Sequence, residues 1–216
     1  MECRGASRAD LAEALHGRLR KHRRFLLAQH PRTIEQLEET ITAFDARIEA
    51  ALAPFRDMVE RLSAIPGLSK TSAQILLAEI GTDMTPFATA GHLLSWAGLV
   101  PRLDESAGQR RSTRVKKGAP WLKPVLVQRA WGAARKKNSY FQAQFQRLEA
   151  RRGATKAAIA VAASILTTAY HILKDGTFYQ DLGPEHFARR DPARTARKLA
   201  DKIRSLGDDV EIRGAA

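Results

Sequence analysis

Apolar residues recur at every third or fourth position over residues 34–62, which is the spacing of one face of an α-helix. The steps mostly alternate between three and four, as in the seam of a coiled coil, and charged residues fill several outer positions. The pattern favours a helical hairpin or a dimerising coiled coil, and it fits equally a long amphipathic helix that packs on its own domain. Pro54 is expected to bend either version. The apolar positions are Ile34, Leu37, Ile41, Phe44, Ile48, Leu52, Phe55, Val59 and Leu62.

A second helix is expected before this seam, over residues 8–30. Its basic end, RLRKHRRF, should stop before Pro31, because proline lacks the amide proton that a helix interior requires. The two helices could pair within one chain or between chains.

The segment 64–81 predicts two helices joined by a tight turn, with Pro66 and Gly67 in the turn and Ser69 capping the second helix. This pattern resembles the helix-hairpin-helix module. In that module the hairpin glycine and the N-terminal amides of the second helix contact a nucleic-acid phosphate. Gly67, Ser69 and Lys70 are therefore candidate phosphate contacts. A structural turn between two core helices fits the same residues.

Helical patterns resume over residues 121–137, 140–153 and 155–173. The last of these is rich in alanine, and we expect a buried core helix there. A membrane span is less favoured because the apolar stretch is short and contains Tyr170 and His171. The residues expected to form core contacts early in this region are Trp121, Leu122, Val125, Leu126 and Trp131.

These elements together predict a mainly α-helical protein. Residues 1–63 would form the helical coiled-coil or oligomerisation segment. Residues 64–183 would form a compact helical domain with the hairpin and a basic loop. Residues 184–216 read as a mixed-charge tail with one helix at 192–205. A chain of 216 residues with 44% hydrophobic content can bury a sizeable core.

Positive charge is concentrated in one stretch. The whole chain carries a net charge of +13, and residues 106–156 alone hold 14 basic and 1 acidic groups. Such a concentration is typical of a protein that binds a polyanion. A membrane surface is a weaker candidate, because the stretch lacks an amphipathic helix with a broad apolar face. The single cysteine, Cys3, excludes an intramolecular disulfide, and the absence of a signal-peptide pattern favours the cytoplasm.

The densest part of this charge is the loop SAGQRRSTRVKKG at residues 106–118. It holds two serines, two glycines and five Lys or Arg residues, and no acidic residue. A hydroxyl nucleophile among positive charges suits chemistry on a phosphodiester, because the charges stabilise the negative charge that develops in the transition state. A solvated basic turn has the same composition. The candidate nucleic-acid contacts in and after the loop are Arg110, Arg111, Arg114, Lys116, Lys117 and Lys123.

Several ordered pieces of the chain resemble a single family. They are IPGLSKTSAQILLAEIG, FATAGHLLSWAGLVP, ESAGQRRSTRVKKGAPWLK, AAIAVAASILTTAYHIL and YQDLG. They look like the C-terminal transposase domain of the DEDD-type insertion-sequence transposases, which are guided by a bridge RNA. The coiled-coil segment is also similar, so the resemblance spans about residues 10–190.

The resemblance implies a serine nucleophile. In this family a serine of the C-terminal domain attacks a DNA strand and forms a phosphoserine link, and the serine before the small-Gly pair corresponds to Ser106. Ser112, flanked by Arg111 and Arg114, is the second candidate. The implied partners are DNA, a guide RNA and further copies of the chain through residues 34–62, in the bacterial cytoplasm at the nucleoid.

The family also has an N-terminal RuvC-like domain, in which four acidic residues bind divalent metal. The acidic residues that precede the seam here, Glu2, Asp10 and Glu13, cannot assemble such a site. We therefore expect no metal on this chain, a requirement for Mg²⁺ only with a supplied RuvC-like domain, and deficient strand exchange by the chain alone, as in a truncated copy. The alternative is a non-catalytic remnant that binds nucleic acid and oligomerises.

Overall fold

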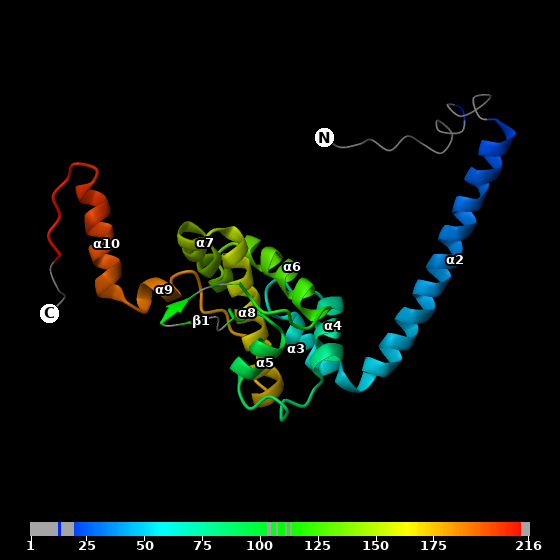
Figure 1. Ribbon diagram of the computed structural model, residues 1–216, viewed down its shortest axis with the longest axis horizontal. Coiled ribbons are helices and arrows are strands. Elements are labelled where there is room, and N and C mark those ends of the chain that lie inside the picture. The colour runs from blue at the N-terminus through cyan, green and yellow to red at the C-terminus, as the bar shows by residue number, and fades with distance from the viewer. Residues whose placement is uncertain are drawn as a thin grey trace. The chain divides into compact units, whose positions relative to one another are not determined.

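The computed structural model describes residues 13, 20–102, 105–106, 108–110, 112 and 114–212, and these are mainly α-helical, as the sequence predicts (Figure 1). By compactness the chain divides into two units, residues 1–54 and 55–216. The helices are α2 (Lys21–Leu52), η1 (Ala53–Phe55, a 3-10 turn), α3 (Arg56–Ser63), α4 (Lys70–Ile80), α5 (Ala90–Trp96), α6 (Leu122–Arg135), α7 (Tyr140–Arg152), α8 (Ala154–Asp175), α9 (His186–Arg189) and α10 (Pro192–Arg204).

The expectation that a helix stops before Pro31 is wrong. Helix α2 runs through this residue without interruption, from Lys21 to Leu52. Proline removes one backbone hydrogen bond and leaves the carbonyl of Leu27 without its usual donor, but its fixed φ is compatible with a helix. Good helix formers on both sides continue the helix past it. A hairpin that turns at Pro31 is therefore excluded.

The apolar seam predicted over residues 34–62 is divided between the two units. On α2 five of its large side chains are 44–64% exposed, and Leu52 at the end of the helix is half-buried. Pro54 lies in η1, the 3-10 turn that separates α2 from α3, so the helix is interrupted at this proline. Beyond it, Val59 and Leu62 are buried in the core of the second unit, so they cannot contribute to a seam between chains. The exposed members of the seam are Ile34, Leu37, Ile41, Phe44 and Ile48.

Helix α8 is the centre of the second unit and packs against α3, α5, α6 and α7 (Figure 1). Its alanines favour a helix and let the neighbouring helices approach closely. Among the described residues α8 is the one helix long and apolar enough to cross a membrane by length and composition alone, and half of that stretch is buried inside the unit. The expected core position of this helix is confirmed. Its buried residues are Ala157, Ala158, Val161, Ala162, Ile165, Leu166, Ala169, Tyr170 and Ile172.

Side-chain hydrogen bonds attach the loop after α4 to this central helix. The hydroxyl of Tyr170 donates to the carbonyl oxygens of Phe87 and Ala88, at 2.9 and 3.2 Å. Lys174 donates to the same hydroxyl at 3.0 Å, and this bond raises the pKa of Lys174. The loop that leads into α5 is thereby held on α8, and α5 in turn leads into the basic loop.

Candidate nucleic-acid interface

The basic loop forms an arm of two antiparallel segments. At its outer end β1 (Glu105–Ser106) pairs with β2 (Gln109–Arg110), with Ser106 opposite Gln109. Gly108 lies in the connection between them with a φ of +74°, a conformation that glycine adopts without strain. The candidate nucleophile therefore stands at the last paired position before the tip of the arm.

Closer to the helices, the arm is closed by a second set of backbone contacts. Pro101 and Val115 form an antiparallel bridge pair, and the amide of Arg102 donates to the carbonyl oxygen of Arg114 at 2.9 Å. The two sides of the loop are thus held together at its root as well as near its tip.

Two glycines fix the root of the arm against the end of α5. A Cβ atom built on Gly118 would overlap the carbonyl group of Ala97, and one on Gly98 would lie 2.7 Å from the Cα of Gly118. Gly98 also has a φ of +71°. Here the chain entering the arm touches the chain leaving it, backbone against backbone, and any side chain would separate them.

Lys123, in the first turn of α6, ties that helix to the arm. Its Nζ donates to the carbonyl oxygen of Lys116 at 2.8 Å, and partial burial lowers the pKa of its ammonium group. The structure thus gives Lys123 a role in holding the arm. Its contact with nucleic acid stays a prediction.

The two candidate serines differ in what their hydroxyls do. Ser106 is exposed, and among the described residues no hydrogen bond engages its hydroxyl. The hydroxyl oxygen of Ser112 accepts a hydrogen bond from the amide of Arg114 at 3.2 Å, which is a local turn that orders the backbone. Among the described residues, the Ser106 hydroxyl is therefore the one of the two that takes part in no hydrogen bond.

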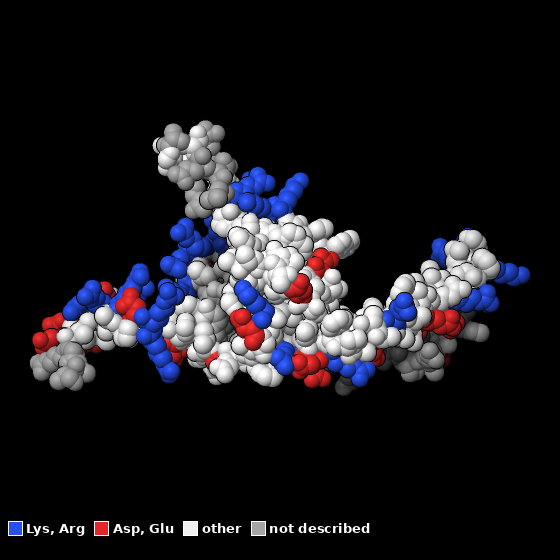
Figure 2. Space-filling model, turned by 90° about the horizontal axis from the view of Figure 1, so that it is seen from below, with Lys and Arg blue, Asp and Glu red and all other residues white. Residues whose placement is uncertain are grey.

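Three described cations of the arm, Arg114, Lys116 and Lys117, can be followed in the structure. Arg114 and Lys117 are exposed and Lys116 is half-buried. Within the described part of the chain none of the three forms an ion pair. Arg110 lies in β2, and Arg111 lies outside the described residues. Figure 2 shows Lys and Arg gathered in groups on the helical domain, with a broad uncharged area beside them.

The turn between α3 and α4 forms as the sequence predicts. The amide of Leu68 donates to the carbonyl oxygen of Ile65 at 3.0 Å, and Gly67 at the third position has a φ of +88°, as in a type II turn. The hydroxyl of Ser69 accepts from the amide of Ser72 at 3.3 Å, which confirms Ser69 as the cap of α4.

Gly67 has a packing role that the sequence pattern did not reveal. A Cβ atom on this residue would lie 2.5 Å from the carbonyl oxygen of Arg129 and 2.8 Å from the amide nitrogen of Ala133, both on α6. The hairpin therefore rests on the second half of α6, whereas Lys123 and the arm lie at its start. At about 1.5 Å per residue, Lys123 lies about 9 to 15 Å along the helix from the two residues that Gly67 approaches. The structure does not bring the hairpin and the arm together at one phosphate.

Trp121 is the residue whose surroundings the sequence pattern misjudged most. Its side chain is 73% exposed, so the expected core contact is wrong. Trp131 is 37% exposed, and its ring packs against that of Phe145 with centroids 5.3 Å apart. Leu122 and Leu126 are fully buried, as expected. An exposed indole next to a basic arm is a candidate platform for an unpaired base.

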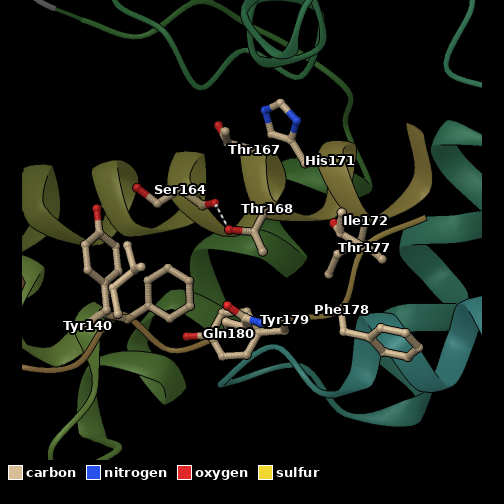
Figure 3. A pocket seen from close by; sticks show the side chains of 12 residues that line it. Tyr140, Ser164, Thr167, Thr168, His171, Ile172, Thr177, Phe178, Tyr179 and Gln180 are labelled. Atoms are coloured by element: carbon tan, nitrogen blue, oxygen red, sulfur yellow. Dashed lines mark hydrogen bonds between the residues drawn. The ribbon is translucent and has the colours of Figure 1, made fainter. Parts of the chain in front are cut away.

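A cavity of about 640 Å³ lies between α7, α8 and the segment after α8 (Figure 3). No Lys or Arg is among its lining residues. Two of its hydroxyl groups bond within the protein: Thr168 donates to the carbonyl oxygen of Ser164 at 3.0 Å, and Gln144 donates to the Ser164 hydroxyl at 2.8 Å. Burial also raises the pKa of Tyr179 at its wall, so that phenol stays neutral. The cavity lacks an anchor for a phosphate, and the candidate interface is the arm.

Comparison with known proteins places this arm inside a matched region. Residues 59–146 match the sequence profile described as "Transposase IS116/IS110/IS902 family". Over 159 residues the chain is 30% identical to the "Insertion element IS110 uncharacterized 43.6 kDa protein" of Streptomyces coelicolor, a stretch that covers 70% of this chain and 37% of that protein.

A second relative is the "Probable family 20 transposase" of Pseudomonas aeruginosa, which is 28% identical over 159 residues, or 72% of this chain and 46% of the relative. The matched part of the chain thus spans less than half the length of either relative. The matched part of the chain is thus similar to insertion-sequence transposases of the IS116/IS110/IS902 type.

Proposed function

We propose that this chain carries the strand-transfer part of an insertion-sequence transposase, with Ser106 as the nucleophile that attacks a DNA phosphodiester. One observation carries the proposal. The Ser106 hydroxyl is exposed and without a hydrogen-bond partner among the described residues. It stands on a paired arm on which Arg114, Lys116 and Lys117 form no ion pair with a described acid. The family match over residues 59–146 includes the whole arm.

In the proposed reaction the Ser106 Oγ forms a bond to phosphorus and the bond from phosphorus to one bridging oxygen of the strand breaks. The hydroxyl proton passes to a base, and the released strand end takes up a proton at its oxygen. Arg114, Lys116 and Lys117 would hold the phosphate groups around the reacting one and stabilise the charge on phosphorus. The product is a phosphoserine ester, which a free strand end can attack in turn to complete transfer.

No group of three or more His, Cys, Asp or Glu side chains that could hold a metal ion occurs among the described residues. We propose that a RuvC-like domain, in the same protein or supplied by another chain, binds Mg²⁺ and completes the site. That metal would polarise the attacked phosphate and help to remove the serine proton.

Two further partners belong to the proposal. A guide RNA would share the basic surface with DNA, because both present phosphates to the same cations. Copies of the chain would associate through α2, whose large apolar side chains are exposed along one face. A helix with such a face is stabilised when a partner covers it.

A second function is a non-catalytic module that binds nucleic acid and oligomerises. It predicts the same binding but no covalent product. This function is compatible with the family match, because the arm and the hairpin could bind nucleic acid without a serine nucleophile.

Covalent capture distinguishes the two functions. Labelled target DNA is incubated with the chain, a supplied RuvC-like domain and Mg²⁺, and protein-linked DNA is separated under denaturing conditions. We expect an adduct with the wild type and with Ser112→Ala, and none with Ser106→Ala. An adduct that persists in Ser106→Ala and is lost in Ser112→Ala would overturn the assignment of the nucleophile. Binding without any adduct would support the non-catalytic module.

A further inference from the structure

Beside the root of the arm lies a second cavity, of about 650 Å³. Its walls are aliphatic and come from two sides. Leu99 and Val115 belong to the two segments of the arm, and Ile159 and Ala160 belong to one face of α8. We call it the arm-root pocket. Its size lies within the range of pockets that bind small molecules.

Three cations from three different elements line the same pocket. Arg114 lies on the arm, Arg152 ends α7, and Lys156 lies in the first turn of α8. All three are exposed, and in the described part of the chain none has an acidic partner. The first turn of α8 contains no acidic residue, so the partial positive charge of the helix start adds to theirs. The open side of the pocket is therefore positive and its inside is apolar.

We propose that the arm-root pocket takes one unpaired nucleotide of a nucleic-acid strand lying on the arm. The base would enter against Ile159 and Ala160, and its phosphate would lie on Arg114, Arg152 and Lys156. A nucleotide offers these two kinds of surface side by side, an apolar ring face and an anion. Inorganic phosphate has no apolar surface that could pack against the aliphatic walls. A base inside an intact duplex stays stacked and cannot enter.

The distance from the pocket to Ser106 indicates what the bound nucleotide would do. Pro101, which also lines the pocket, is five residues from Ser106 along the arm, at most about 17 Å at the rise of an extended strand. A nucleotide held at the root would fix the register of the strand along the arm. It would thereby select which phosphate lies at Ser106. This inference rests on the proposed function, because it assigns the pocket to the same substrate strand.

The test compares the affinity of the full chain for two labelled DNA duplexes of identical sequence, one of which carries a single extra unpaired adenosine. We expect the wild type to bind the bulged duplex about fivefold or more tightly. Ala160→Leu fills the pocket with an aliphatic group that cannot stack on a base. It should bring the two affinities within about twofold of each other by weakening binding to the bulged duplex.

Ala163→Leu is the matched control, since Ala163 is half-buried on the same helix and does not line the pocket. It should keep the preference. A parallel pair of bulged and paired RNA duplexes decides whether the unpaired nucleotide comes from DNA or RNA. Thermal unfolding followed by circular dichroism shows that both variants fold.

A wild type that binds both DNA and both RNA duplexes without preference, or an undiminished preference in Ala160→Leu, overturns the pocket assignment and leaves the proposed function standing. Absence of binding to any duplex overturns both.

The charged side of the pocket is tested separately. Arg152→Ala should weaken binding to the bulged duplex more than Arg151→Ala, the adjacent arginine that does not line the pocket. Equal effects would contradict the placement of the phosphate.

Discussion

At the scale of single residues, glycines decide where one backbone can touch another. Gly67 lets the hairpin rest on α6, and Gly118 lets the two ends of the arm meet at Gly98. Neither contact is local, and each fixes one of the two predicted nucleic-acid contact regions relative to the helices. Substitution at these positions should therefore affect tertiary structure more than local conformation.

Gly67→Ala should lower the free energy of unfolding by roughly 2 kcal/mol or more, because it adds an overlap with α6 to the strain of a positive φ. Gly81→Ala is the matched control. Gly81 also has a positive φ, of +75°, but a Cβ there meets no atom within 4 Å. Urea unfolding of both variants measures the difference. If they lose equal stability, the contact with α6 contributes nothing.

Residue roles were predictable from the sequence where they depend on near neighbours. The Ser69 cap of α4 could be recognised because a cap acts within three residues. The contact of Gly67 with Arg129 could not, since nothing local marks a residue 62 positions away. The same limit applies to the exposure of Trp121, which depends on what the rest of the fold leaves uncovered, while its spacing alone resembles that of a core residue.

At the scale of elements, the arm is held by few contacts, and these concentrate at its root. The strands β1 and β2 are two residues each, too short to show an alternating pattern, so the sequence predicted a loop. The longer helices α4, α6, α7 and α8 were predicted within a few residues because their periodicity extends over several turns. Pro31 misled the prediction, because a single residue was weighted above the helix formers around it.

Gly118→Ala should loosen the arm, because the added methyl group overlaps the backbone of Ala97, the residue that follows α5. We expect faster hydrogen exchange at the amide of Arg102, which closes the arm by donating to Arg114. Gly91→Ala on α5 is the control, since its Cβ would meet only the Thr89 hydroxyl at an ordinary 3.5 Å. Unchanged protection in Gly118→Ala would mean that the arm does not depend on this contact.

At the scale of the whole molecule, charge and apolar surface are separated along the chain. The net charge of residues 106–156 equals that of the entire protein, whereas the largest run of exposed apolar side chains lies on α2. Composition and charge therefore predicted the class of partner. The sequence could not show that the seam is divided between the two units, because its apolar spacing runs without a break over residues 34–62. The structure shows that five of its members on α2 are exposed whereas Val59 and Leu62 are buried in the second unit.

Replacing four arm cations by alanine tests the charge. The residues are Arg110, Arg111, Lys116 and Lys117. DNA affinity should fall for all sequences, and the slope of its logarithm against that of salt concentration should become shallower by up to about 3.6. The control variant replaces four cations of α10 by alanine, so that both variants have the same net charge. The four residues are Arg194, Arg197, Lys198 and Lys202. Equal flattening by both variants would attribute binding to net charge and not to the arm.

Association through α2 is tested by placing charge on its apolar face. Leu37→Lys combined with Phe44→Lys puts two cations where a partner would bury apolar surface, so the mass measured by analytical ultracentrifugation should fall by about half or more if this face pairs copies of the chain. Ala46→Lys is the control, because at 3.6 residues per turn it projects from roughly the opposite side of the helix. Since no residue of α2 is buried, folding of the second unit should be unaffected in all variants. A mass that is unchanged in the double variant would show that association, if any, uses another surface, and would remove α2 from the proposed assembly.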